Sequence, residues 1–251
     1  MPDATRYSDD LRAAVALIRG GHPERAIPLL DRLIESDPTC MIALRERGYA
    51  KSFHGDHEGA VADFTTLIGR WPADPAGFTG RAAARERAGD RPGAIADYSA
   101  AISLDPRHPF AFLQRGRLRA QAGDVSGAVA DFTADMAHSR MGPLSGLLNR
   151  GPARHRSGDV QGAIADLTEA MRLEGPPPVF APLFRGRVLL AAGDYTGAIA
   201  DFTAAIEAFP GLTNAYRQRA EARARAGDPA GAEEDRRSYE QLGGHDLPAY
   251  E

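Results

Sequence analysis

The sequence predicts an all-α protein, an α-solenoid of seven antiparallel helix pairs, on the evidence of three regularities. Glycines recur at nearly constant spacing, each is followed five residues later by an alanine, and apolar residues follow that alanine at helical spacing. A period of 34 or 35 residues is typical of repeats whose two helices bury their apolar faces only by stacking on neighbouring repeats. The glycine and alanine pairs are Gly21 and Ala26, Gly55 and Ala60, Gly89 and Ala94, Gly123 and Ala128, Gly158 and Ala163, Gly193 and Ala198, and Gly227 and Ala232.

Aligning the repeats on these residues divides the chain along its length. We expect an N-terminal tail over residues 1–6, one continuous solenoid over 7–246 and a C-terminal tail over 247–251. Residue positions below are counted from the first residue of each repeat. The seven repeats are residues 7–40, 41–74, 75–108, 109–143, 144–178, 179–212 and 213–246.

Each part of a repeat has a physical reason in the sequence. A small residue at position 8 and Ala at position 20 allow the two helices to approach closely. Gly at position 15 ends the first helix in the left-handed conformation, as Gly55 does in the second repeat. The Asp that follows it, Asp56 in that repeat, can cap the free N–H groups of the second helix. Pro at position 32, such as Pro72, ends the second helix.

These positions together resemble the tetratricopeptide repeat family, which has small residues at 8, Ala at 20, a large residue at 24 and Pro at 32. The resemblance implies a right-handed superhelix whose first helices line an inner, concave face, and a protein-binding function. One departure is position 11, which is mostly Arg where the family prefers Tyr. The residues that carry the resemblance are Ala14, Gly48, Ala82, Gly116, Gly151, Gly186 and Ala220 at position 8, Leu30, Phe64, Tyr98, Phe132, Leu167 and Phe202 at position 24, and Pro38, Pro72, Pro106 and Pro210 at position 32.

Arginine at position 7 and aspartate at position 23 occur in the same six repeats. The first repeat has neither, because Ala13 and Leu29 stand there. This joint absence favours an ion pair within each repeat over one between neighbouring repeats. The pairs are Arg47 and Asp63, Arg81 and Asp97, Arg115 and Asp131, Arg150 and Asp166, Arg185 and Asp201, and Arg219 and Asp235.

Composition indicates a protein without cofactor, disulfide or membrane anchor. The formal charge is −4, the only cysteine is Cys40, and no apolar run reaches the length of a membrane span. The N-terminal residues lack the order of a signal peptide, so we expect a cytoplasmic protein. Arginine supplies all but one of the 30 basic residues, which suggests a bacterial coding sequence. Charged residues at both ends of the array, such as Asp9 and Arg236, favour a monomer.

The first helices carry the candidate ligand-binding residues. In the family, positions 2, 5, 6, 9, 12 and 13 commonly meet the ligand, and we call these positions the first-helix face. Here they hold nine Arg against three Glu, so we expect a basic groove that binds an acidic or extended peptide. The alternative is a merely solvated face. The candidate residues, all at these positions, are Arg87, Phe110, Gln114, Arg117, Gln121, Asn149, His155, Arg156, Phe184 and Arg187.

The fifth repeat departs from the pattern, which points to repeats four to six as the main ligand site. Pro152 lies within its first helix and should kink it. Asp135, just before this repeat, occupies position 27, where the other repeats have an apolar or aromatic residue. A buried acid needs a partner, and Arg150, Arg154 or His155 could provide one. Tolerated drift is an equally good explanation.

Other functions find less support. The chain lacks the glycine motif of phosphate loops and the motifs of zinc proteases and serine hydrolases, so we expect no catalytic activity. The cluster from His54 to Glu58 lies on an inter-helix turn, and we expect no metal there. Single-stranded RNA on the inner face remains an alternative, disfavoured by the negative charge and single Lys. A scaffold that uses the outer face is another. A carboxylate-binding subclass of the family uses Lys and Asn at positions 5 and 9, where the first repeat has Leu11 and Val15.

Overall fold

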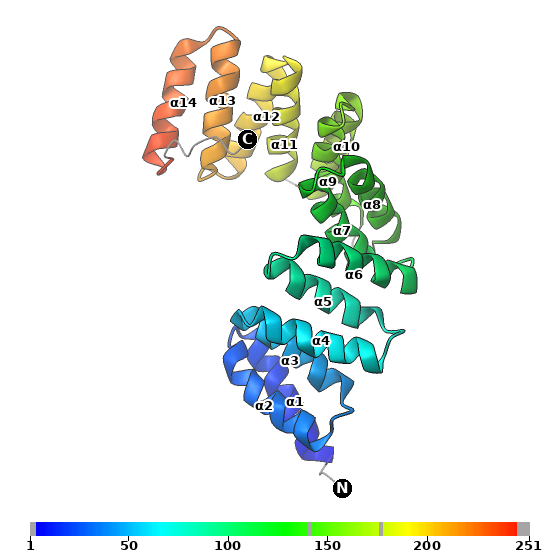
Figure 1. Ribbon diagram of the computed structural model, residues 1–251. Coiled ribbons are helices and arrows are strands. Elements are labelled where there is room, and N and C mark those ends of the chain that lie inside the picture. The colour runs from blue at the N-terminus through cyan, green and yellow to red at the C-terminus, as the bar shows by residue number, and fades with distance from the viewer. Residues whose placement is uncertain (1–3, 140–141, 176–177, 245–251) are drawn as a thin grey trace. The chain divides into compact units, whose positions relative to one another are not determined.

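The computed structural model describes residues 4–139, 142–175 and 178–244, which form fourteen α-helices and no strand (Figure 1). The predicted all-α class of paired helices is therefore confirmed. The helices are α1 (Ala4–Arg19), α2 (Pro23–Ser36), α3 (Met41–His54), α4 (His57–Arg70), α5 (Pro75–Arg87), α6 (Arg91–Leu104), α7 (Pro109–Gln121), α8 (Val125–His138), α9 (Leu144–Arg156), α10 (Val160–Glu174), α11 (Phe180–Ala192), α12 (Tyr195–Ala208), α13 (Thr213–Arg225) and α14 (Pro229–Gln241).

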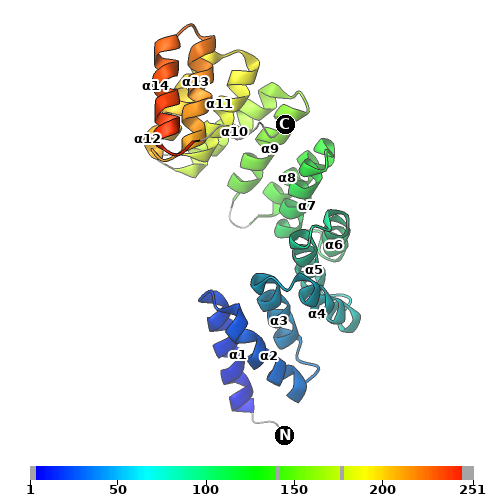
Figure 2. The ribbon, with the colours of Figure 1, turned by 60° about the vertical axis from the view of Figure 1, so that its left-hand side comes forward.

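The helices belong to two compact units, Met1–Leu118 and Arg119–Glu251, which divide within α7. In the first unit each helix from α1 to α6 packs against the next one, and in the second unit the same holds from α8 to α14 (Figure 2). The first helices of adjacent repeats also touch, α1 with α3 and α3 with α5 in one unit, α9 with α11 and α11 with α13 in the other. Within each unit the first helices are therefore neighbours.

The turn inside each repeat has the predicted geometry. Gly55 ends α3 with a φ of 96°, and the six other position-15 glycines also have positive φ, which Gly adopts without steric cost. The side chain of Asp56 accepts a hydrogen bond from the backbone N–H of Gly59 at 2.9 Å. The same cap begins α6, α8, α10, α12 and α14. His22 takes this place in the first repeat and makes no side-chain cap.

The large residue at position 24 forms the core between helices. Phe64 is fully buried, and a Cβ added to Gly48 would lie 2.9 Å from its ring. Gly186 stands in the same relation to Phe202, at 2.8 Å. Position 8 is small because this ring occupies the space that a side chain would need.

The structure bears on the expected tails, on the helix that contains Pro152 and on the expected solvated end of the array. Helix α1 begins at Ala4, within the segment expected as an N-terminal tail, since no Gly or Pro between Ala4 and Tyr7 interrupts the helix. Helix α9 continues through Pro152 to Arg156, so Pro152 lies within the first helix of its repeat, as the sequence predicts, and the kink expected there stays a prediction. The expected tail 247–251 lies outside the described residues. At the other end, Glu233 and Arg236 of α14 are exposed, as expected of a solvated end helix.

Candidate functional site

Arginine at position 7 binds aspartate at position 23 of the same repeat. Arg150 donates from Nε and Nη2 to the two carboxylate oxygens of Asp166, at 2.8 and 2.7 Å. The side chain of Asp166 is only 5% exposed, so this two-pronged ion pair ties the helices of the repeat together. The predicted pair within the repeat is confirmed here and for Arg47 and Asp63, Arg81 and Asp97, Arg185 and Asp201, and Arg219 and Asp235.

The remaining nitrogen of the same arginines reaches the preceding repeat, a contact that sequence reasoning missed. Arg47 Nη1 donates to Asp31 Oδ1 at 2.7 Å, and Arg185 Nη1 donates to Thr168 Oγ1 at 2.9 Å. Every acceptor lies at position 25 on the second helix of the preceding repeat. A recurrent Asp, Thr or Ser at that position was the available signal. The other donor and acceptor pairs are Arg81 and Thr65, Arg115 and Ser99, Arg150 and Thr133, and Arg219 and Thr203.

A second cation at position 11 holds the same aspartate, which explains the Arg found where the family prefers Tyr. Arg154 Nη1 lies 2.8 Å from Asp166 Oδ1, and its Nε lies 3.5 Å from the capping Asp159. The sixth repeat is the exception, because Leu189 stands at position 11. The equivalent cations are Lys51 on Asp63, Arg85 on Asp97, Arg119 on Asp131 and Arg223 on Asp235. Most arginines at positions 7 and 11 are therefore structural.

In the first unit, the candidate Arg87 already has partners at a repeat junction. Its Nη1 donates to Ser52 Oγ at 2.9 Å, and its guanidinium lies 4.9 Å from the ring centre of Phe53. The ring of Phe53 is 57% exposed. Arg87 and Phe53 thus present a charged group and an apolar surface side by side, a pairing that cation–π attraction stabilises.

The candidates on α7 share one side of that helix. Phe110, Gln114 and Arg117 are separated by four and three residues, the spacing of neighbours along a helix. Phe110 is 48% exposed and meets the ring of Tyr98 edge-on at 6.3 Å. Arg117 is exposed and donates to Gln114 Oε1 at 2.7 Å.

In the second unit, Gln121, Arg156 and Arg187 are exposed. Arg156 Nη1 donates to the backbone oxygen of Ala120 at 3.3 Å. Asn149 donates to the backbone oxygen of its own helix, so its amide is partly used. Because α9 and α11 touch, Asn149, Arg156 and Arg187 lie on adjacent helices.

Two further candidates of this unit are less accessible. Phe184 is half-buried and packs against the cluster formed by Leu167 and Val188. The Nδ1 atom of His155 is buried and has no hydrogen-bond partner among the described residues. Both residues stand at positions of the first-helix face, but each is only partly exposed.

Acidic neighbours reduce the positive charge of the first-helix face. Glu221 Oε1 lies 2.7 Å from Arg225 Nη2, and Glu46 lies 3.4 Å from Arg45. Arg12 pairs with Asp9. The positive charge of this face is therefore smaller than the number of its arginines suggests.

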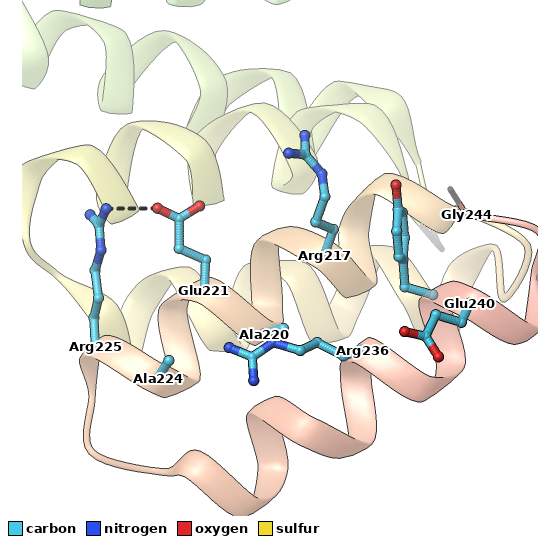
Figure 3. A pocket seen from close by; sticks show the side chains of 9 residues that line it. Arg217, Ala220, Glu221, Ala224, Arg225, Arg236, Glu240 and Gly244 are labelled. Atoms are coloured by element: carbon cyan, nitrogen blue, oxygen red, sulfur yellow. Dashed lines mark ion pairs between the residues drawn. The ribbon is translucent and has the colours of Figure 1, made fainter. Parts of the chain in front are cut away.

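A hollow of about 700 Å³ lies between α13 and α14 (Figure 3). In interior repeats a large apolar side chain stands at position 24, as Phe202 does over Gly186, but here Arg236 stands there near Ala220, so no such side chain fills the space. Charge within the hollow is mixed, since Arg225 pairs with Glu221. Its lining is Arg217, Ala220, Glu221, Ala224, Arg225, Arg236, Tyr239, Glu240 and Gly244.

A second hollow, of about 590 Å³, lies on α1 and α3 of the first unit. Sequence reasoning missed its exposed apolar member, Ile42, which is 45% exposed. The available signal was position 2, where Phe110 and Phe180 are also exposed. The lining is Leu11, Arg12, Val15, Ala16, Arg19 and Ile42.

Asp135 lacks the expected partner. Its side chain is buried, and Oδ2 has no hydrogen-bond partner among the described residues. The expectation that Arg150 or Arg154 would bind it is wrong, because Asp166 takes both. His155 is not its partner either, and burial alone raises the pKa of Asp135.

Replacing Asp135 by Ala, the residue at this position in three other repeats, should raise the free energy of unfolding at pH 7 by about 1 to 3 kcal/mol, because a buried unsatisfied carboxyl is removed. The raised pKa means that the folded state holds the proton more tightly. The stability contributed by Asp135 is thus present below the ordinary value of 3.8 and is lost as the pH rises through the folded-state pKa. Urea unfolding at several pH values checks this, and a less stable variant at pH 7 would show that the carboxylate makes a favourable contact.

Among the described residues no group of three or more His, Cys, Asp or Glu side chains is placed to hold a metal ion. Nor does any helix within those ranges combine the length and apolar character needed to cross a membrane.

Comparison with known proteins decides the family. A family model described as tetratricopeptide repeat matches residues 11–75, 46–109, 79–137, 148–213 and 183–244. The chain belongs to the tetratricopeptide repeat family. Tetratricopeptide repeat proteins bind protein partners and are generally non-catalytic scaffolds.

Similarity to individual proteins is more limited. The mouse FK506-binding protein-like is 36% identical over 75 residues, which make up 30% of this chain and 21% of that protein. The chain thus spans about a fifth of that relative's length.

Solved structures share the tetratricopeptide fold. A tetratricopeptide repeat protein from Parabacteroides merdae superposes with a TM-score of 0.72 at 16% identity, covering 95% of this chain and 94% of that one. YrrB, described as a tetratricopeptide protein with an unusual peptide-binding site, superposes with a TM-score of 0.57 at 19% identity. The match covers 71% of this chain and 91% of YrrB. MamA from Desulfovibrio magneticus RS-1 superposes with a TM-score of 0.60 at 16% identity, and the match covers 68% of this chain and 96% of that one. At these identities the likeness shows the fold alone.

Proposed function

We propose that this tetratricopeptide repeat protein is a non-catalytic scaffold that holds an extended, acidic segment of a partner protein on its first-helix face. The observation that carries the proposal is the pairing of exposed arginines with exposed apolar side chains on the same first helices. Phe110 and Arg117 share α7, and Phe180 and Arg187 share α11. Guanidinium groups bind carboxylates, and apolar side chains of a peptide pack on exposed rings.

The distribution of arginine supports this assignment. Arginines at positions 7 and 11 are largely committed to the aspartate at position 23, so they stabilise the repeats. Arg117, Arg156 and Arg187 bind none of these aspartates in the described structure and remain exposed. The peptide-binding site ascribed to YrrB is a precedent within the same fold. We place the protein, as a monomer, in the bacterial cytoplasm.

Affinity capture from the native lysate tests the proposal. The chain carrying Arg117→Ala, Arg156→Ala and Arg187→Ala should lose at least about tenfold of a specifically captured partner, since several charge-assisted contacts go together. The control carries Arg25→Ala, Arg91→Ala and Arg107→Ala, which remove equal charge from exposed sites off the first-helix face. Equal capture by both variants would contradict the proposal and favour the outer face.

The same variants distinguish RNA from protein. A binder of single-stranded RNA should retain a labelled mixed-sequence oligonucleotide with an affinity that falls steeply as salt rises. Such binding, lost in the first triple variant alone, would replace the peptide proposal.

A further inference from the structure

The hollow on α1 and α3 is a mainly apolar part of the first-helix face. Leu11 and Val15 reach it from α1, and Ile42 closes it from α3. These residues occupy positions 5 and 9 of one repeat and position 2 of the next. The same positions one repeat later are Arg45, Tyr49 and Ala76, so the next junction does not share the apolar combination. It returns between repeats five and six, as Leu148, Pro152 and Phe180.

Cations alone supply the charge at this hollow. Arg12 and Arg19 line it, and its lining contains no acidic side chain among the described residues. Arg12 pairs with Asp9, which lies outside the lining, whereas Arg19 is exposed in the last turn of α1. An occupant should therefore combine an apolar side chain with a negative charge toward Arg19.

The size of the hollow fits a side chain and its flanking backbone. A volume of about 590 Å³ lies within the range of small-ligand sites. Ile42 is 45% exposed, so one wall of the hollow is accessible from solvent. An extended segment can then insert one side chain while its backbone continues along the helices.

Resting on the proposed function, we infer that this hollow anchors one large apolar residue of the partner segment, flanked by an Asp or Glu that pairs with Arg19. The first repeat thereby sets specificity by shape and charge. The arginine-rich parts of the face contribute charge attraction that is less selective for the sequence of the peptide.

Selection of twelve-residue peptides from a random phage-displayed library against the immobilised full chain tests the inference. The enriched peptides should share a large apolar residue next to an acidic one. In their labelled synthetic form, Ile42→Asp should raise the Kd about tenfold or more, because it places a carboxylate in the anchor site. The matched control is Leu104→Asp on the same unit, where the side chain is 42% exposed but lies off this face, and it should change the Kd less than about twofold.

Charge pairing is tested separately on the enriched peptides. Replacing their acid by the matching amide should weaken binding about two- to fivefold to the wild type and leave binding to Arg19→Gln unchanged. An equal loss with both chains would overturn the pairing with Arg19. The melting temperature of each variant is measured as a control. Values within about 2 °C of the wild type show that the variants are folded and can be compared.

The outcomes separate the two proposals. Enriched peptides whose affinity falls with Arg156→Ala and Arg187→Ala but not with Ile42→Asp would overturn the anchor and leave the proposed function standing. A library that yields no bound peptide would overturn both. Self-association of the wild type that Ile42→Asp abolishes would assign the hollow to a second copy, against the inference.

Discussion

Replacing Arg185 by Ala is expected to lower the free energy of unfolding by about 3 kcal/mol or more, because a buried carboxylate loses its cation. Asp201 is only 6% exposed, and Arg185 is the cation that the described structure places on it. Position 11 of this repeat is Leu189, so no second cation takes over. The hydrogen bonds to Asp201 also hold the pKa of Arg185 above its ordinary value.

Arg150→Ala is the matched comparison in the same unit. In this variant Arg154 still lies 2.8 Å from Asp166, so the free energy of unfolding should fall by less, about 1.5 kcal/mol. Urea unfolding of the two variants measures the difference, and hydrogen exchange of α12 locates it, since repeat arrays can open locally. The combination of Arg185→Ala with Leu189→Arg should recover part of the stability. Equal losses in Arg185→Ala and Arg150→Ala would contradict the role given to position 11.

Phe64→Ala should lower the free energy of unfolding by about 3 to 5 kcal/mol, because the ring is fully buried between two repeats. It packs on Gly48 of its own repeat and on Gly80 of the next, where a Cβ would overlap the ring. The substitution therefore leaves a cavity that neither glycine can fill. Thermal or urea unfolding of the full chain measures the loss.

Gly80→Ala tests the same contact from the opposite side. The added methyl group should lower the free energy of unfolding by about 1 to 3 kcal/mol, because the site is already filled. Combined with Phe64→Leu it should cost clearly less than the sum of the two single changes, since the smaller side chain makes room. Additive losses would mean that the ring of Phe64 and the backbone at Gly80 do not limit each other.

The regular parts of this fold could be predicted because they depend on residues close in sequence. Gly55 and Asp56 determine a turn by local backbone geometry, and the repeated Arg and Asp pair identified itself by its joint absence from the first repeat. The sequence also predicted which helix faces are buried, since position 24 marks the core.

The remaining contacts depend on how helices of different repeats are rotated and spaced. Several arginines lie within reach of each aspartate, and only coordinates show that Arg154 joins Arg150 on Asp166. The prediction of partners for Asp135 was wrong for the same reason, because the arginines that reach a given carboxylate depend on how the helices pack. The candidate site was predicted as residues along the first helices, but the apolar hollow at Ile42 depends on the packing of α1 against α3.

Parallel melting and capture measurements on three chains separate the arginines that hold repeats together from those assigned to binding. The chain with Arg117, Arg156 and Arg187 replaced by Ala should melt within about 2 °C of the wild type and lose its captured partner. The chain with Arg185→Ala should melt several degrees lower. Loss of stability without loss of binding in the triple variant would contradict the division of the arginines on which the proposed function depends.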